Sequence, residues 1–85
     1  MQKFIAEVNA LLHEANVSAH MMAKSVGEHY RVAPITVRKS LAGAMPMSYD
    51  TYVALNETML RHGFKLSYTP IDFYRDKGAE LCLSK

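Results

Sequence analysis

Residues 26–43, VGEHYRVAPITVRKSLAG, constrain the fold of this chain more than any other stretch. Val26 and Tyr30 stand four residues apart before a short interruption, and Val37 and Leu41 stand four apart after it. Because side chains four residues apart lie on one face of an α-helix, each half presents an apolar stripe. The pattern predicts two short helices that pack against each other across a tight turn.

Gly27 and Pro34 indicate how the two helices meet. A glycine in the first helix allows the second to cross it closely, because no side chain stands at the contact. Pro34 suits the first turn of the second helix, where its missing N–H and fixed φ cost nothing. Ala33 offers no side-chain cap, which gives up about 1 kcal/mol and leaves the first N–H groups to water or a phosphate.

The second helix has a mixed outer face. Its inward residues are predicted to be Val37, Ser40 and Leu41, and its outward residues Pro34, Ile35, Arg38, Lys39 and Ala42. An apolar tip followed by two cations suits a DNA major groove, where it can meet a thymine methyl and then guanine edges or phosphates. We therefore expect this outward set to read bases, with Ala42 close by.

Charge is concentrated around this helix pair. The whole chain has a net charge of only +2, but the segment 20–43 holds four cations and a single anion, Glu28. A basic segment that coincides with the helix-pair spacing favours DNA as the partner. The side chains expected to hold phosphates are Lys24, Arg31, Thr36 and Ser48.

The remaining periodicity predicts a mainly α-helical chain. Helical spacing covers residues 3–16, 19–30, 34–42 and 49–62. Asn16 and Gly43 suit helix ends, and Ser18 and Ser48 suit N-caps. Residues 1–63 are therefore predicted to form a four-helix domain, with the DNA-reading pair at about 19–42.

After Gly63 the apolar period changes to two. Apolar residues alternate with polar ones over 64–68 and again near the end, which predicts strands at 64–68 and 80–84 around a short helix at 71–77. We predict a β/α/β tail over residues 64–85 whose free strand edges pair with a second copy of the chain. The predicted dimer-interface residues are Phe64, Leu66, Tyr68, Leu81 and Leu83.

Residues 32–64, which include the second helix of the predicted pair, resemble the DNA-binding headpiece of the lactose-repressor family. In that family V-S-x-x-T-V-S-R-x-L-N-G precedes V-S-x-x-T-x-x-x-V-x-x-x-I-x-x-L-G-Y, and here VAPITVRKSLAG is followed by PMSYDTYVALNETMLRHGF. The matching positions are Val32, Thr36, Val37, Leu41, Gly43, Ser48, Thr51, Leu55, Met59, Gly63 and Phe64. The resemblance implies a helix-turn-helix transcriptional repressor that binds operator DNA.

Two other helix-turn-helix families share parts of the pattern. Residues 27–41 are similar to the winged helix of gluconate-type repressors, although no glycine-rich wing follows at once. SAHMMAKSVG, residues 18–27, resembles the second helix of lambda Cro and lambda repressor, and stand-alone phage and plasmid repressors of this kind have a similar size. A lambda-repressor-like arrangement is the fold class we expect, and without the small-ligand domain of lactose-type repressors we expect no small-molecule effector.

No pattern in the chain points to catalysis or to a metal. There is no G-x-S-x-G, phosphate loop or paired carboxylate site, so we expect no enzyme. The four histidines, His13, His20, His29 and His62, lack zinc-ligand spacing, and Cys82 is the only cysteine, so we expect neither metal nor cofactor. No apolar run approaches the ~18 residues of a membrane span and no secretory signal is evident, which predicts a cytoplasmic chain with no membrane partner.

Taken together, the sequence predicts a homodimer that represses transcription by occupying a near-palindromic operator in double-stranded DNA. Two alternatives stay open. One is a protein-interaction module of helix-turn-helix shape, such as an antitoxin or a phage inhibitor of a host protein. The other is an architectural or excision-type protein that bends DNA.

Overall fold

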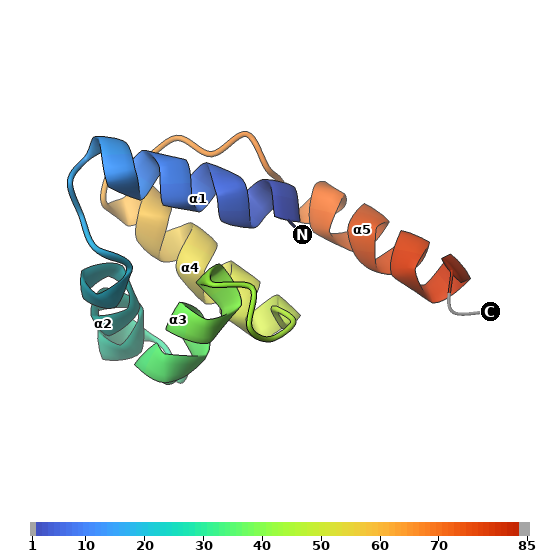
Figure 1. Ribbon diagram of the computed structural model, residues 1–85, viewed down its shortest axis with the longest axis horizontal. Coiled ribbons are helices and arrows are strands. Elements are labelled where there is room, and N and C mark those ends of the chain that lie inside the picture. Colours follow the sequence, from blue (N-terminus) through green and yellow to red (C-terminus); the bar gives the residue numbers. More distant parts are fainter. Residues whose placement is uncertain (1, 84–85) are drawn as a thin grey trace.

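Five helices account for most of the residues that the structure describes. The structure is a computed structural model that describes the backbone of residues 2–83 and the side chains of residues 2–77. The helices are α1 (Gln2–Glu14), α2 (Ala19–His29), α3 (Pro34–Leu41), α4 (Tyr49–Arg61) and α5 (Pro70–Leu83). The four helices expected over residues 3–62 are confirmed to within two residues at each end, and α1 to α4 form one bundle (Figure 1).

The helix ends follow from a few residues with special backbone or side-chain roles. α1, α3 and α4 are followed by residues with positive φ: Asn16 (59°), Gly43 (76°) and Gly63 (89°). In each case the next N–H donates back to a carbonyl of the last turn: Val17 to Leu12, Ala44 to Lys39 and Phe64 to Met59. At the other ends, the hydroxyls of Ser18 and Ser48 accept N–H groups of the first turns of α2 and α4. These turns fix where the chain changes direction.

The core is organised around Tyr52 of α4, whose side chain is fully buried. Its ring lies edge-on to Phe4 of α1 at 4.8 Å between centroids and stacks on Phe73 of α5 at 5.0 Å. Tyr68 completes the group, with its centroid 5.2 Å from that of Phe4. Aromatic pairs at these distances contribute about 0.5–1.5 kcal/mol each beyond their burial. The cluster therefore holds α1, α4 and the start of α5 together.

Gly27 and Pro34 meet as the sequence predicts. A Cβ built at Gly27 would lie 3.0 Å from Cγ and 3.2 Å from Cδ of Pro34. No residue larger than glycine fits there without moving the proline ring. The α2–α3 pair therefore depends on the absence of a side chain at this contact.

The predicted β/α/β tail is wrong, because none of residues 64–83 forms a strand. Residues 64–69 form an irregular connection across α1, where the Glu7 carboxylate accepts the N–H groups of Ser67 (2.9 Å) and Tyr68 (3.1 Å) and the Ser67 hydroxyl. The backbone donors that a strand would give to a neighbouring strand are thus taken by a side chain. The alternation of residues 64–68 is real, but its apolar members face the chain's own core: Tyr68 is buried, and Phe64 and Leu66 are half-buried.

The second predicted strand, at 80–84, falls largely within α5, which continues through Gly78 to Leu83. Glycine weakens a helix by about 0.5–1 kcal/mol but ends it only where φ turns positive. The side chains of Leu81 and Leu83, and residue Ser84, lie outside the described residues. Strand pairing therefore cannot form the dimer contact that the sequence predicts.

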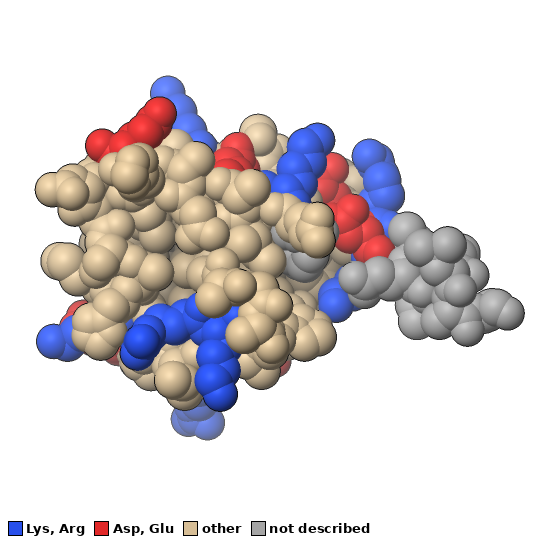
Figure 2. Space-filling model, viewed as in Figure 1, with Lys and Arg blue, Asp and Glu red and all other residues tan. Residues whose placement is uncertain are grey.

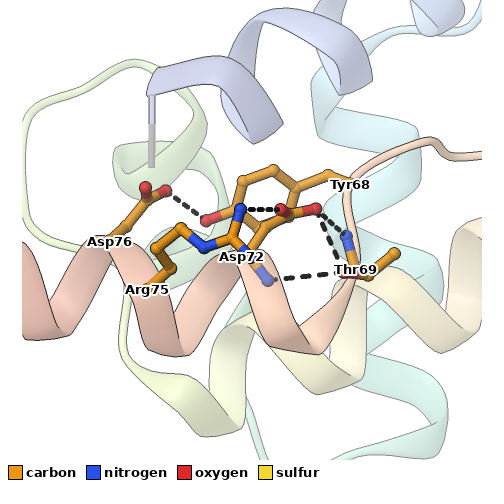
Figure 3. Close-up of polar contacts among 5 residues, drawn as sticks. All are labelled: Tyr68, Thr69, Asp72, Arg75 and Asp76. Carbon is orange, nitrogen blue, oxygen red and sulfur yellow. Dashed lines mark hydrogen bonds and ion pairs between the residues drawn. The ribbon is translucent and has the colours of Figure 1, made fainter.

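α5 leaves the bundle beyond the N-terminal end of α1 (Figure 1), and its first turns are held by polar contacts (Figure 3). The Thr69 N–H donates to Asp72 (2.9 Å) and the Asp72 N–H donates to the Thr69 hydroxyl (3.3 Å), which is a reciprocal cap. One turn later the Tyr68 hydroxyl donates to the Asp76 carboxylate. Within residues 2–83, no helix has the length and apolar character needed to cross a lipid bilayer.

Gly27→Ala tests the close contact between α2 and α3. Alanine favours helix by about 0.5–1 kcal/mol, but the clash with the rigid Pro34 ring is expected to cost about 1–3 kcal/mol of overpacking. We therefore expect a net loss in the free energy of unfolding, measured by urea denaturation. Pro34→Ala in the Gly27→Ala background should recover part of the loss, and purely additive effects of the two changes would contradict the contact.

Glu7→Gln tests the anchor of the 64–69 connection. Burial acts to raise the pKa of the Glu7 carboxyl, but the hydrogen bonds from Ser67 and Tyr68 outweigh it and hold this pKa below its ordinary value of 4.5. The stabilisation is therefore complete above pH 4.5 and is lost as the pH falls through the lower, folded-state pKa. The difference in unfolding free energy between parent and Glu7→Gln should shrink as the pH falls through this range, and a difference that does not change with pH would contradict the anchor.

Candidate nucleic-acid interface

The outer face of α3 carries the side chains that the sequence singled out for base contact. Pro34, Ile35, Arg38, Lys39 and Ala42 are all exposed. Ile35 keeps 52% of its surface exposed, which is high for an isoleucine on a helix that packs on α1, α2 and α4. The predicted orientation of α3 is confirmed, because Val37, Ser40 and Leu41 are buried on its opposite side.

α3 is held from several directions, which fixes this orientation. Pro34 rests on Gly27 at its start. At its end, the Asn9 side-chain amide of α1 donates to the Leu41 carbonyl (3.2 Å), one of the carbonyls that a helix end leaves without a partner in the helix itself. No sequence pattern predicts this role for Asn9, because it is an exposed polar residue on α1 like its neighbours on that face.

Four of the five outward residues of α3, all except Pro34, line one shallow, open hollow of about 440 Å³. Its lining consists of Ile35, Arg38, Lys39 and Ala42 together with Ala19 at the start of α2 and Ala44 after α3. Ala19 and Ala44 were not among the predicted site residues, and their small side chains leave room around the two cations. The hollow thus combines one exposed apolar side chain with two long cations and three small alanines.

The positive charge around α3 is visible on the surface (Figure 2). Lys and Arg side chains gather along the lower edge of this face, over α3, with little red beside them, whereas along the upper edge, over α1 and the start of α5, Lys and Arg stand among Asp and Glu. Lys24 is exposed and precedes Gly27 by three residues, so it lies on the flank of α2 beside the start of α3. An anionic ligand that approaches α3 meets cations from both helices.

Arg31 and Ser48 are placed differently from the α3 residues. Arg31 lines a second hollow of about 320 Å³, between the α2–α3 connection and the start of α4, where Asp50 is also part of the lining. The Ser48 hydroxyl accepts the Thr51 N–H (3.2 Å) and donates to the Thr51 hydroxyl (2.9 Å), so it serves as the cap of α4. The structure does not bring either residue into the hollow on α3.

Thr36 is half-buried on the first turn of α3, and its N–H donates to the Ala33 carbonyl (2.9 Å). Ala33 makes no side-chain cap, and Pro34 has no N–H to offer. The first turn of α3 therefore has few donors for a phosphate, and a phosphate contact here would involve the Thr36 hydroxyl or the Ile35 N–H.

Polar contacts brace α2 against α4 behind the candidate interface. The Tyr30 hydroxyl donates to Glu57 (2.6 Å) and accepts from Arg61 (3.2 Å), and the Glu57 hydrogen bond raises the pKa of this phenol above its ordinary value. Ser25 and His62 are hydrogen-bonded at 3.0 Å. These pairs keep α2, and with it α3, in a fixed position on α4.

Neither a metal-ion site among the described residues nor a similar known protein helps to assign a function to this interface. Among the described residues, no three His, Cys, Asp or Glu side chains lie close enough together to hold a metal ion. No family model, no curated protein and no solved structure matches the chain. The functional argument therefore depends on the arrangement of the side chains alone.

Ser40→Ala tests the buried side of α3. The Ser40 hydroxyl is fully buried and has no hydrogen-bond partner among the described residues. An unpaired buried hydroxyl costs about 1–3 kcal/mol, so its removal should raise the free energy of unfolding by about 1 kcal/mol. The matched control is Thr58→Val, which removes a buried hydroxyl that donates to the Ala54 carbonyl (2.7 Å) and should bring no gain. A loss of stability in Ser40→Ala would contradict the unpaired hydroxyl.

Proposed function

We propose that this chain is a sequence-specific DNA-binding protein of the helix-turn-helix type that represses transcription. The observation that carries the proposal is the outer face of α3, where Ile35, Arg38 and Lys39 are exposed on a helix whose other side is buried. An exposed apolar side chain beside two cations is a surface suited to binding an anionic partner with apolar features, such as a DNA groove.

The dimensions of α3 fit a major groove. With its side chains an α-helix is about 10–12 Å across, which matches the groove width of about 12 Å in B-form DNA, and the eight residues of α3 run about 12 Å along the groove. An exposed isoleucine at the N-terminal end can contact a thymine methyl, and an arginine one turn later can make a bidentate contact with guanine. In this arrangement α3 is the reading helix and α2 crosses above it.

Cations on both helices supply the phosphate contacts. Lys24 on α2 and Lys39 near the end of α3 are both exposed and are the cations proposed to bind phosphates. Arg31 reaches a phosphate only if it turns away from Asp50 in the neighbouring hollow. Under this proposal the chain works on operator DNA in the cytoplasm of its host, as a repressor similar to the stand-alone phage and plasmid repressors.

The direct experiment is a binding assay on purified protein. A gel shift with the DNA upstream of the chain's own coding region, and selection from a library of random duplexes, should both yield a preferred sequence. With Lys24, Arg31 and Lys39 as the phosphate contacts and Arg38 on a base, affinity should fall about 40-fold per copy between about 50 and 200 mM salt. Binding that does not depend on salt, or a selection without enrichment, would contradict the proposal and favour the protein-interaction module.

Arg38→Ala and Lys24→Ala separate base contact from phosphate contact. Arg38→Ala should lose about 1–3 kcal/mol of discrimination at one base pair, because a bidentate contact is removed. Lys24→Ala should weaken binding to all sequences alike and reduce the salt slope by about 1. Lys65→Ala, which removes an exposed cation outside α2 and α3, is the control and should change neither. Arg38→Ala with the parent's affinity and sequence preference would show that α3 does not read bases in this way.

A further inference from the structure

The start of α5 and the start of α4 share an exposed apolar patch. Ile71 and Tyr74 are 68% and 63% exposed, and Tyr49 is 40% exposed. Ile71 and Tyr74 are three residues apart on α5 and so lie on one face, and the Tyr74 ring lies 5.5 Å from the Tyr49 ring between centroids. The three side chains form one continuous surface, here called the Tyr74 patch.

The Tyr74 patch is anchored to the hydrophobic core through Tyr49 and Phe73. The Tyr49 ring contacts Phe73 edge-on at 5.3 Å, and Phe73 stacks on the buried Tyr52. The reciprocal cap between Thr69 and Asp72 and the bond from Tyr68 to Asp76 hold the first turns of α5 (Figure 3). A partner therefore finds these side chains already positioned, and little conformational entropy is lost on binding.

The size of the Tyr74 patch indicates a weak interface. Each half-exposed large side chain offers roughly 100 Å², so the patch amounts to about 300 Å². Patches of this size on a monomer often mark interaction sites. A stable interface needs about 800 Å² from each partner, so this surface fits an association that is transient in the free protein.

The charges around the Tyr74 patch fit a second copy of the chain. Asp50 follows Tyr49 and is exposed, and Arg75 follows Tyr74 with 75% of its side chain exposed. Arg75 lies 3.9 Å from Asp72, a distance that leaves its guanidinium available to a further carboxylate. Arg31 lines the hollow beside Tyr49 and Asp50 as well, so charges of both signs border the patch. Such a mixed surface is complementary to itself across a two-fold axis, on which the Arg75 of one copy can meet a carboxylate of the other.

We propose that two copies of the chain associate through Tyr49, Ile71 and Tyr74, weakly when free and more strongly when both copies sit on one DNA duplex. The inference rests on the proposed function for its second half, because an eight-residue reading helix covers only a few base pairs and its site is incomplete with a single copy. Helix and aromatic surfaces thus replace the strand edges that the sequence predicts for the dimer contact.

The test uses the full chain and four variants of similar kind. Sedimentation equilibrium from about 1 μM to about 1 mM should show reversible dimerisation in the weak range expected for a small interface. Ile71→Gln and Tyr74→Gln should each raise the dimer dissociation constant at least about tenfold, since each removes roughly a third of the apolar patch. Met21→Gln and Leu60→Gln change side chains that are 62% and 52% exposed elsewhere on the surface and should leave the constant unchanged. Circular dichroism verifies that every variant keeps its helices.

A chain that stays monomeric over the whole range, or a dimer that all four variants weaken alike, overturns the proposal. On a duplex with two selected half-sites, the parent should bind cooperatively, and Tyr74→Gln should bind each half-site as the parent does but without cooperativity. Dimerisation without DNA binding would leave this contact standing and overturn the proposed function. DNA binding by independent monomers would overturn this contact and leave the proposed function standing.

Discussion

The contact between Gly27 and Pro34 sets the geometry on which the candidate interface depends. The proline ring occupies the space that a side chain at residue 27 would fill, so the start of α3 lies closer to α2 than any residue other than glycine at this position would allow. The start of α3 is held at this contact, and the Leu41 carbonyl at its end accepts a hydrogen bond from Asn9. Together the two contacts set the orientation of α3. Val37, Ser40 and Leu41 then face the core, and the two cations and Ile35 face outward. One small residue on α2 thus decides which side of α3 a ligand can reach.

The aromatic cluster around Tyr52 has a separate task. It ties α1, α4 and the start of α5 into one block, while α2 is joined to that block by the Tyr30, Glu57 and Arg61 contacts. The Tyr52 hydroxyl has no partner among the described residues, and burial raises the pKa of this phenol above its ordinary value. The cluster is therefore held by ring packing, and the polar contacts act mainly at its edges.

Features that depend on residues close together in the sequence could be predicted, and features that depend on residues far apart in the sequence could not. Helix spans, caps and the inward face of α3 follow from spacings of three and four residues and from Asn16, Gly43 and Gly63, which act within a single turn. The path of residues 64–68 instead depends on the carboxylate of Glu7, about sixty residues earlier, which accepts the N–H groups of Ser67 and Tyr68. No local pattern contains that information. The placement of Arg31 outside the α3 hollow is non-local in the same way, because Arg31 lines a hollow that forms where the start of α4 meets the α2–α3 connection.

The failed strand prediction also explains how the start of α5 is placed. An extended segment with one face on the core produces the same alternation of burial as a strand, whether its N–H groups meet a neighbouring strand or a carboxylate. Because Glu7 binds the segment at Ser67 and Tyr68, the chain reaches Thr69 beside the aromatic cluster and can begin a helix there. That position buries Phe73 and at the same time leaves Ile71 and Tyr74 uncovered next to Tyr49. The same carboxylate that removes the strand edge from the surface therefore creates the aromatic surface that stands in its place.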